Sequence, residues 1–213
     1  MPEIKNVFIK NGELILEAEI YISHSDDHNS AILITHPHPS YGGNMHNNVV
    51  SAVFNTFITN GISSLRFNFR GVGLSNGSHS DGTGELSDVN ACIDYLISVY
   101  NYQKIFICGY SYGAAIGCSA VNYSEKIIGY CAISFPWDFM GSKFKNLSQT
   151  DKPKLFIQGD NDTIALYTNF NEHYQYYLTP KTKKIIEGAD HFYWGFEHLV
   201  AKEVYDFFKA TFH

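Results

Sequence analysis

The sequence lacks long hydrophobic runs. In its 213 residues no uninterrupted apolar stretch reaches the roughly 18 residues that suggest a membrane-spanning helix, and the best candidate, residues 105–121, is broken by tyrosines, serines and glycines. The first residues, Met1 to Asn6, show no positively charged segment followed by an apolar one. We therefore expect neither an export signal nor a membrane partner.

Cysteine and basic residues are also scarce. The four cysteines, Cys92, Cys108, Cys118 and Cys131, are widely spaced within predicted helices or strands, which is typical of buried free thiols in a reducing cytosol. Lys and Arg total 15 against 21 Asp and Glu, so the net charge is −6. Because nucleic-acid binding needs clustered basic side chains, we expect no nucleic-acid partner. The free thiols favour a cytoplasmic location.

The sequence contains enough apolar residues to form a large hydrophobic core. Hydrophobic residues make up 45%, including 16 Phe and 15 Tyr, whereas charged residues make up 17%. A chain of 213 residues still fits one core, so we expect a single domain over residues 1–213. The oligomeric state is left open.

Apolar periodicity predicts alternating strands and helices. Asn11 and Gly12 separate two apolar segments, which predicts an antiparallel hairpin. The predicted strands are residues 7–9, 14–22, 31–35, 64–68, 105–108, 127–133, 155–158 and 183–186, and the predicted helices are residues 48–59, 85–100, 112–121, 166–177 and 195–212. This alternation predicts an α/β fold, a three-layer α/β/α sandwich with a mostly parallel sheet.

Residues 109–113, Gly-Tyr-Ser-Tyr-Gly, lie between a predicted strand and a predicted helix. In that context a G-x-S-x-G pattern is typical of a tight turn that exposes a nucleophilic serine, with glycines where side chains would collide. The first free amides of the helix lie beside the serine, where they can hold an oxyanion. We predict Ser111 as the nucleophile and the amide of Tyr112 as one oxyanion donor.

A serine nucleophile needs a base and a carboxylate that fixes the base. Asp162 and His191 each follow a later predicted strand and complete the order serine, acid, histidine. Asp160 competes for the acid role, but we favour Asp162 because the loop must carry the carboxylate away from the strand. The predicted catalytic residues are Ser111, Asp162 and His191.

The histidine-rich segment after the predicted strand 31–35 permits two interpretations. His36, His38 and His46 would make a metal site, but zinc sites with several histidines usually draw them from a helix face or add a carboxylate. We therefore favour a site without metal or other cofactor. The other interpretation is an oxyanion loop.

In that loop, prolines limit which backbone amide can be the second oxyanion donor. Pro37 and Pro39 have no N–H, so the amide of His38 is the predicted donor. The amides of Ser40 and Tyr41 are the alternatives.

The glycine-rich residues 69–75 resemble a phosphate-binding loop only superficially, because they lack the Lys-Ser/Thr ending and no helix follows directly. We interpret them as a structural turn that Arg70 pins by pairing with Glu85 or Asp88.

A substrate pocket is expected beside these loops. The segment 134–154 is too short for a lid domain, since an independent core needs about 40 residues. Aromatic side chains near the predicted strand ends are candidates for an apolar acyl pocket. The candidate pocket residues are Tyr41, Trp137, Phe192 and Trp194.

Together these segments resemble the alpha/beta-hydrolase superfamily, in particular its small branch without a lid, near dienelactone hydrolase. The resemblance extends over nearly the whole chain and rests on residues 36–44, 68–73, 109–113, 159–162 and 189–192. It implies the alpha/beta-hydrolase fold, on which esterases, thioesterases, lactonases, peptidases and dehalogenases all occur. Ser111 stands where dienelactone hydrolase has a cysteine, and the HGGG-type loop of lipases is absent.

The sequence thus predicts a serine hydrolase of the carboxylesterase or thioesterase type, which cleaves a small ester or thioester through an acyl-enzyme. The alternatives are a peptidase of the same fold, a non-catalytic binding or scaffold protein, and a metal-dependent hydrolase. The acyl group and the leaving group are left open.

Overall fold

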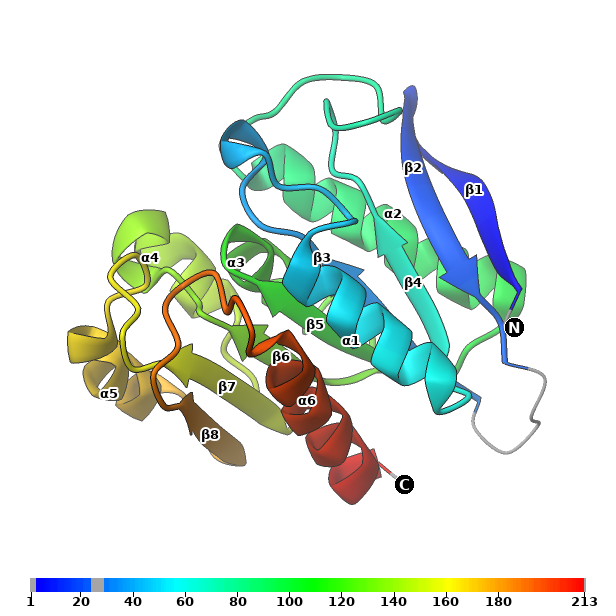
Figure 1. Cartoon of the computed structure of the whole chain (residues 1–213). Coiled ribbons are helices and arrows are strands. Elements are labelled where there is room, and N and C mark those ends of the chain that lie inside the picture. Colours follow the sequence, from blue (N-terminus) through cyan, green and yellow to red (C-terminus); the bar gives the residue numbers. More distant parts are fainter. Residues whose placement is uncertain (1–2, 24–28, 213) are drawn as a thin grey trace.

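The computed structural model describes residues 3–23 and 29–212, which form one eight-stranded sheet with helices on both faces (Figure 1). The strands are β1 (Ile4–Asn11), β2 (Leu14–Tyr21), β3 (Ser30–Thr35), β4 (Ser63–Phe67), β5 (Lys104–Tyr110), β6 (Ile127–Ile133), β7 (Lys154–Gly159) and β8 (Lys181–Ile186). The helices are α1 (Asn48–Thr59), α2 (Thr83–Tyr100), α3 (Tyr112–Cys118), α4 (Trp137–Leu147), α5 (Tyr167–Tyr176) and α6 (Glu197–Phe212), with a short 3₁₀ turn at Pro39–Tyr41.

The strand order is β1-β2-β4-β3-β5-β6-β7-β8. β1 and β2 form the antiparallel hairpin that the sequence predicts, turning at Gly12, whose φ of +60° suits glycine. β2 pairs antiparallel with β4, and from β4 to β8 all neighbours are parallel. The basic stretch 181–184 falls on the edge strand β8, where its side chains are largely exposed.

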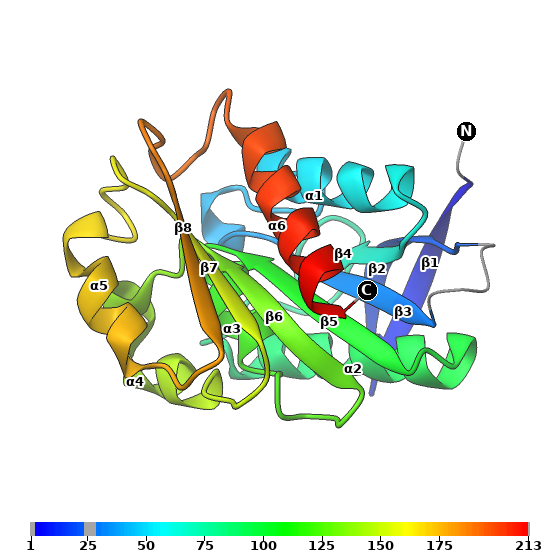
Figure 2. The same cartoon turned by 90° about the horizontal axis from the view of Figure 1, so that it is seen from below.

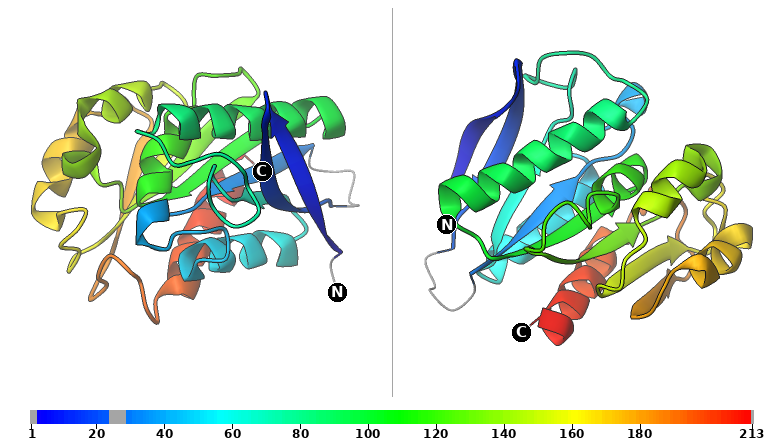
Figure 3. Two further views of the ribbon diagram at one scale, coloured as in Figure 1. Left: turned by 90° about the horizontal axis from the view of Figure 1, so that it is seen from above. Right: turned by 180° about the vertical axis from the view of Figure 1, so that it is seen from behind.

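The helices make the two outer layers. α1 and α6 pack on one face of the sheet, and α2, α3, α4 and α5 pack on the other (Figure 2). Viewed from behind, α2 and α3 lie across the strands (Figure 3, right). Each face has its own buried apolar cluster, so the predicted three-layer α/β/α fold is confirmed.

The structure adds one helix that the sequence analysis does not predict. α4 occupies the segment between β6 and β7, begins after Pro136 and is bent at Gly141, where φ is +73°. Those two residues hide the helical pattern. This segment makes no separate lid domain. The predicted helix 112–121 ends earlier, at Cys118.

The cysteines carry free thiols. All four cysteines are buried and form no disulfide, and burial raises the pKa values of Cys92, Cys118 and Cys131.

Within residues 3–23 and 29–212, none of the helices combines the length and the apolar character that crossing a bilayer requires.

Candidate active site

Ser111 lies on a strained turn between β5 and α3, with φ +56° and ψ −122°. The turn is tight enough that its flanking residues have no space for a side chain. A Cβ atom at Gly109 would overlap the backbone of Gly113, and one at Gly113 would overlap the carbonyl oxygens of Thr35 and His36. The glycine spacing therefore reflects backbone contact between β5, β3 and α3.

Ser111, His191 and Asp162 form one hydrogen-bonded chain. Nε2 of His191 lies 2.8 Å from Oγ of Ser111, and Nδ1 of His191 lies 2.8 Å from Oδ2 of Asp162. All three residues are buried, with at most 8% exposure. They come from the loops after β5, β7 and β8, so the carboxyl ends of the strands bring them together.

Asp162 is fixed by several donors besides His191. Ser134 Oγ donates to Oδ2 at 2.7 Å, and the amides of Ile164 and Ala165 donate to Oδ1 at 2.9 and 2.8 Å. Burial alone would raise the pKa of Asp162, but hydrogen bonds from His191, Ser134 and the Ile164 amide outweigh it and lower the pKa. This carboxylate is held ionised and oriented.

Asp160, the alternative acid, has a different partner. Its Oδ1 accepts the amide of Gly188 at 2.7 Å, which ties the loop after β7 to the turn after β8. Of the two aspartates, the structure brings only Asp162 to His191.

Three side chains that the sequence-based predictions do not include support the chain of hydrogen bonds. Ser134 and Gln158 both donate to Asp162, and Tyr110 donates to the carbonyl oxygen of His191 at 2.6 Å. Ser134 directly follows β6, and Gln158 and Tyr110 lie at the ends of β7 and β5. Their places at strand ends are visible in the sequence, but their residue types do not single them out as parts of the site.

The loop after β3 presents one free amide of the three considered. Ser40 donates its N–H to Nδ1 of His38 at 3.1 Å, and Tyr41 donates its N–H to the carbonyl oxygen of His38 at 3.1 Å. The N–H of His38 itself has no acceptor within residues 3–23 and 29–212. Tyr112 is the first residue of α3, a position whose N–H has no partner inside the helix.

His36 is a structural residue. Its Nδ1 lies 2.7 Å from the carbonyl oxygen of Pro37, and its Nε2 accepts the amide of Phe69 at 3.1 Å. Burial lowers the pKa of His36 to about 4, so the ring is neutral at pH 7. Both ring nitrogens are engaged, so His36 has no free lone pair for a metal ion. The ligand set of His36, His38 and His46 would need one.

A cavity of about 560 Å³ opens beside Ser111. Its lining is mostly apolar and aromatic. The lining residues are Pro37, His38, Tyr41, Gly42, Gly43, Asn47, Tyr110, Ser111, Tyr112, Pro136, Phe139, Ile164, His191 and Phe192. Of the predicted pocket residues, Tyr41 and Phe192 lie here.

Trp137 and Trp194 do not line this cavity, which corrects the sequence-based expectation. Trp137 points into the core below α4, where its ring stacks on Phe135 and its Nε1 donates to Tyr177 at 2.8 Å. Trp194 is 71% exposed, because its neighbour Tyr193 takes the buried position in the same loop. Proximity in sequence to a catalytic loop does not determine side-chain direction.

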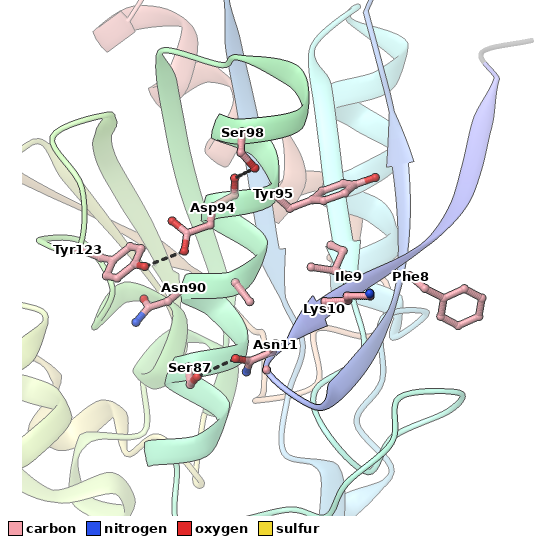
Figure 4. A pocket seen from close by; sticks show the side chains of 12 residues that line it. Phe8, Ile9, Lys10, Asn11, Ser87, Asn90, Asp94, Tyr95, Ser98 and Tyr123 are labelled. Carbon is pink, nitrogen blue, oxygen red and sulfur yellow. Dashed lines mark hydrogen bonds between the residues drawn. The ribbon is translucent and has the colours of Figure 1, made fainter.

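A second hollow, of about 620 Å³, lies between the β1–β2 hairpin and α2 and is lined by residues such as Asn11, Asn90 and Tyr123 (Figure 4). It contains none of the residues of the hydrogen-bonded chain. We therefore take the cavity beside Ser111 as the candidate site.

A mostly parallel sheet that carries a strained serine between a strand and a helix defines the alpha/beta-hydrolase class of fold. The family model described as an alpha/beta hydrolase domain matches residues 28–198. The chain therefore belongs to the alpha/beta hydrolases.

The chain is also similar to an uncharacterised bacterial protein and to solved structures. A protein of Rickettsia prowazekii, described as uncharacterised, is 37% identical over 168 residues, which are 76% of this chain and 71% of the relative. A solved structure of an alpha-beta serine hydrolase homologue from Coxiella burnetii is 27% identical with a TM-score of 0.84, covering 96% of this chain and 98% of that one. A protein of unknown function from Agrobacterium tumefaciens is 29% identical with a TM-score of 0.88, covering 96% and 95%.

Proposed function

We propose that this hydrolase cleaves a small carboxylic ester or thioester through an acyl-enzyme, with Ser111 as nucleophile, His191 as base and Asp162 as the orienting acid. The observation that supports this most is the continuous chain of two 2.8 Å hydrogen bonds from Ser111 through His191 to Asp162. The order and contacts are those that nucleophilic serine catalysis requires.

The proposed reaction begins when Oγ of Ser111 attacks the substrate carbonyl carbon while Nε2 of His191 takes the hydroxyl proton. Asp162 stabilises the imidazolium that forms. When the tetrahedral intermediate collapses, the C–O or C–S bond breaks and His191 returns the proton to the departing alkoxide or thiolate. Water then attacks the acyl-enzyme by the same route, which releases the carboxylic acid and restores Ser111.

The negative charge of the tetrahedral intermediate needs hydrogen-bond donors. We propose the amides of Tyr112 and His38 as the oxyanion hole. The free N–H of His38 supports this choice, because the amides of Ser40 and Tyr41 are engaged within the loop. Removing one such donor typically costs about 10²- to 10³-fold in turnover.

The cavity lining supports an uncharged substrate. Among the described residues that line it there is no Lys, Arg, Asp or Glu. A charged acyl group would lose its hydration there without gaining an ion pair. Tyr41, Phe139 and Phe192 offer apolar surface, so we propose a small neutral acyl group.

The decisive experiment compares wild type with Ser111→Ala. We expect wild type to react with a fluorophosphonate probe and to hydrolyse short-chain esters or acyl thioesters. Ser111→Ala should lose labelling and about 10⁶-fold in kcat, as loss of a catalytic serine does elsewhere. Ser98→Ala is the matched control, because Ser98 is exposed on α2 (Figure 4) and its Oγ donates to the carbonyl oxygen of Asp94 within the same helix.

Two results would contradict the proposal. One is a folded wild-type protein that neither labels nor turns over any ester, thioester or peptide, which would favour a binding or scaffold role. The other is unchanged ester turnover in Ser111→Ala.

A further inference from the structure

The glycine-rich loop of residues 68–82 is attached to α2 through two buried carboxylates. Asp88 receives the guanidinium of Arg70, with Nη2 at 2.7 Å and Nε at 3.0 Å from its oxygens, and also the amide of Arg70 at 3.0 Å. The sequence-based pairing of Arg70 is thus with Asp88. Glu85, one turn earlier, holds the other end of the loop.

Glu85 is completely buried and gathers the residues just before α2. It accepts the amide and the hydroxyl of Ser80, each at 2.7 Å, and the amide of Gly82 at 3.0 Å. Burial works against ionisation, but the hydrogen bonds from Ser80 and the charge interaction with His79 lower the pKa of Glu85 overall. The carboxylate is therefore a fixed negative charge.

The His79 side chain lies beside Glu85 and next to His38 of the candidate site. Its Nδ1 lies 2.8 Å from Oε1 of Glu85. Nδ1 of His79 forms no hydrogen bond to another described residue, so the contact with Glu85 is one of close approach. The His79 side chain is 29% exposed, which limits how much its burial contributes to stability.

The ring of His79 packs against the two residues that supply the proposed oxyanion amides. The ring centroids of His79 and His38 are 4.8 Å apart, and those of His79 and Tyr112 are 5.6 Å apart. His38 and Tyr112 also contact each other, at 4.7 Å. The three rings form a cluster that joins the loop after β3 to the first residue of α3. His79 itself does not line the cavity.

We propose that His79 is a positioning residue, which holds the amides of His38 and Tyr112 at the spacing that an oxyanion needs. This inference rests on the proposed function. The His79 ring lies against Glu85 and packs on both oxyanion residues, and His79 is not among the residues that line the cavity. Since a misplacement of about 1 Å can cost about 10²-fold in rate, such a support influences catalysis without contacting the reacting atoms.

The test measures ester hydrolysis by His79→Ala. We expect kcat to fall about tenfold to 100-fold while KM stays within about threefold, because the lost support affects the transition state more than the bound ester. The midpoint of thermal unfolding should change little. His46→Ala is the control: His46 belongs to the neighbouring loop, its side chain is 55% exposed, and its ion-pair distance to Glu19 is 3.9 Å.

A trifluoromethyl ketone separates positioning from a general structural role. Addition of Ser111 Oγ to this ketone forms a hemiketal whose oxyanion occupies the proposed hole. In His79→Ala the affinity for the ketone should fall by about the same factor as kcat/KM, as expected when a substitution acts on transition-state binding. In His46→Ala both should stay at the wild-type values. A lower kcat with unchanged ketone affinity would overturn the inference.

The two proposals fail in different ways. If wild type hydrolyses esters and His79→Ala keeps kcat within about twofold, the positioning role is wrong and the proposed function stands. If wild type hydrolyses neither an ester nor a thioester and does not bind the ketone, the proposed function itself is wrong.

Discussion

At the scale of single residues, the candidate site depends on where one loop directs two similar side chains. Asp160 lies directly after β7 and closes a turn with Gly188, whereas Asp162 extends two residues further and reaches His191. The two carboxylates are chemically alike, so their different partners follow from backbone geometry alone. This makes them a matched pair for experiment.

Replacing Asp162 by Asn keeps the shape of the side chain but removes the charge that stabilises the imidazolium and the acceptor that selects the His191 tautomer. We expect kcat to fall by about 10⁴-fold, as the equivalent change does in other serine hydrolases. Asp160→Asn should retain kcat, because the Asn oxygen can still accept the Gly188 amide. Steady-state kinetics on one ester checks both variants. A larger loss in Asp160→Asn than in Asp162→Asn would show that the acid has been assigned to the wrong residue.

At the scale of elements, the serine turn depends on contact between three backbones. α3 starts so close to β3 that Gly113 lies against the carbonyl oxygens of Thr35 and His36. The same approach brings the loop after β3 to within ring contact of Tyr112, at 4.7 Å from His38. The close packing of α3 on β3 therefore shapes both the nucleophile and the proposed oxyanion hole.

Gly113→Ala tests this packing. A Gly-to-Ala change inside a helix ordinarily stabilises by about 0.5–1 kcal/mol. Here we expect the opposite sign, a loss of about 1–3 kcal/mol, because the new methyl group meets backbone oxygens that cannot rotate away. Chemical denaturation measures the change, and kcat should fall with it as the loop after β3 is displaced. A more stable Gly113→Ala protein would mean that α3 is free to move from β3.

Most helices and strands were predictable because few prolines or glycines interrupt their apolar patterns. The apolar runs of β3, β6 and β7 and the helical spacing of α1 match the structure closely. α4 was not predicted, because Pro136 and Gly141 interrupt its pattern. The direction of Trp137 was not predictable either. It follows from the packing of α4 against the core, which depends on contacts far apart in sequence.

At the scale of the whole molecule, the parallel strands gather distant loops at one edge of the sheet. Ser111 and His191 are 80 residues apart in sequence yet hydrogen-bonded. The order of strands and the residue types at their ends were enough to propose this meeting from sequence. The supporting contacts of His79 and Ser134 were not, because they depend on the exact path of each loop.

The pH dependence of global stability provides a last test, centred on His36. This ring is completely buried between β3 and the loop after β4, and burial lowers its pKa to about 4, with a further decrease from neighbouring His38 and an opposing effect of its bond to Pro37. In the unfolded chain the pKa is 6.5. Between these values the unfolded state binds a proton that the folded state does not, so stability decreases as pH falls through this window.

From pH 7 to pH 5 we expect His36 to account for a loss of about 2 kcal/mol in the free energy of unfolding. Urea denaturation at both pH values, for wild type and His36→Gln, isolates this contribution. Glutamine can still accept the Phe69 amide but does not titrate, so its difference between the two pH values should be smaller by about that amount. If both proteins lose the same free energy, the acid sensitivity arises elsewhere, and His36 is not the buried neutral ring that joins the β3 loop to Phe69.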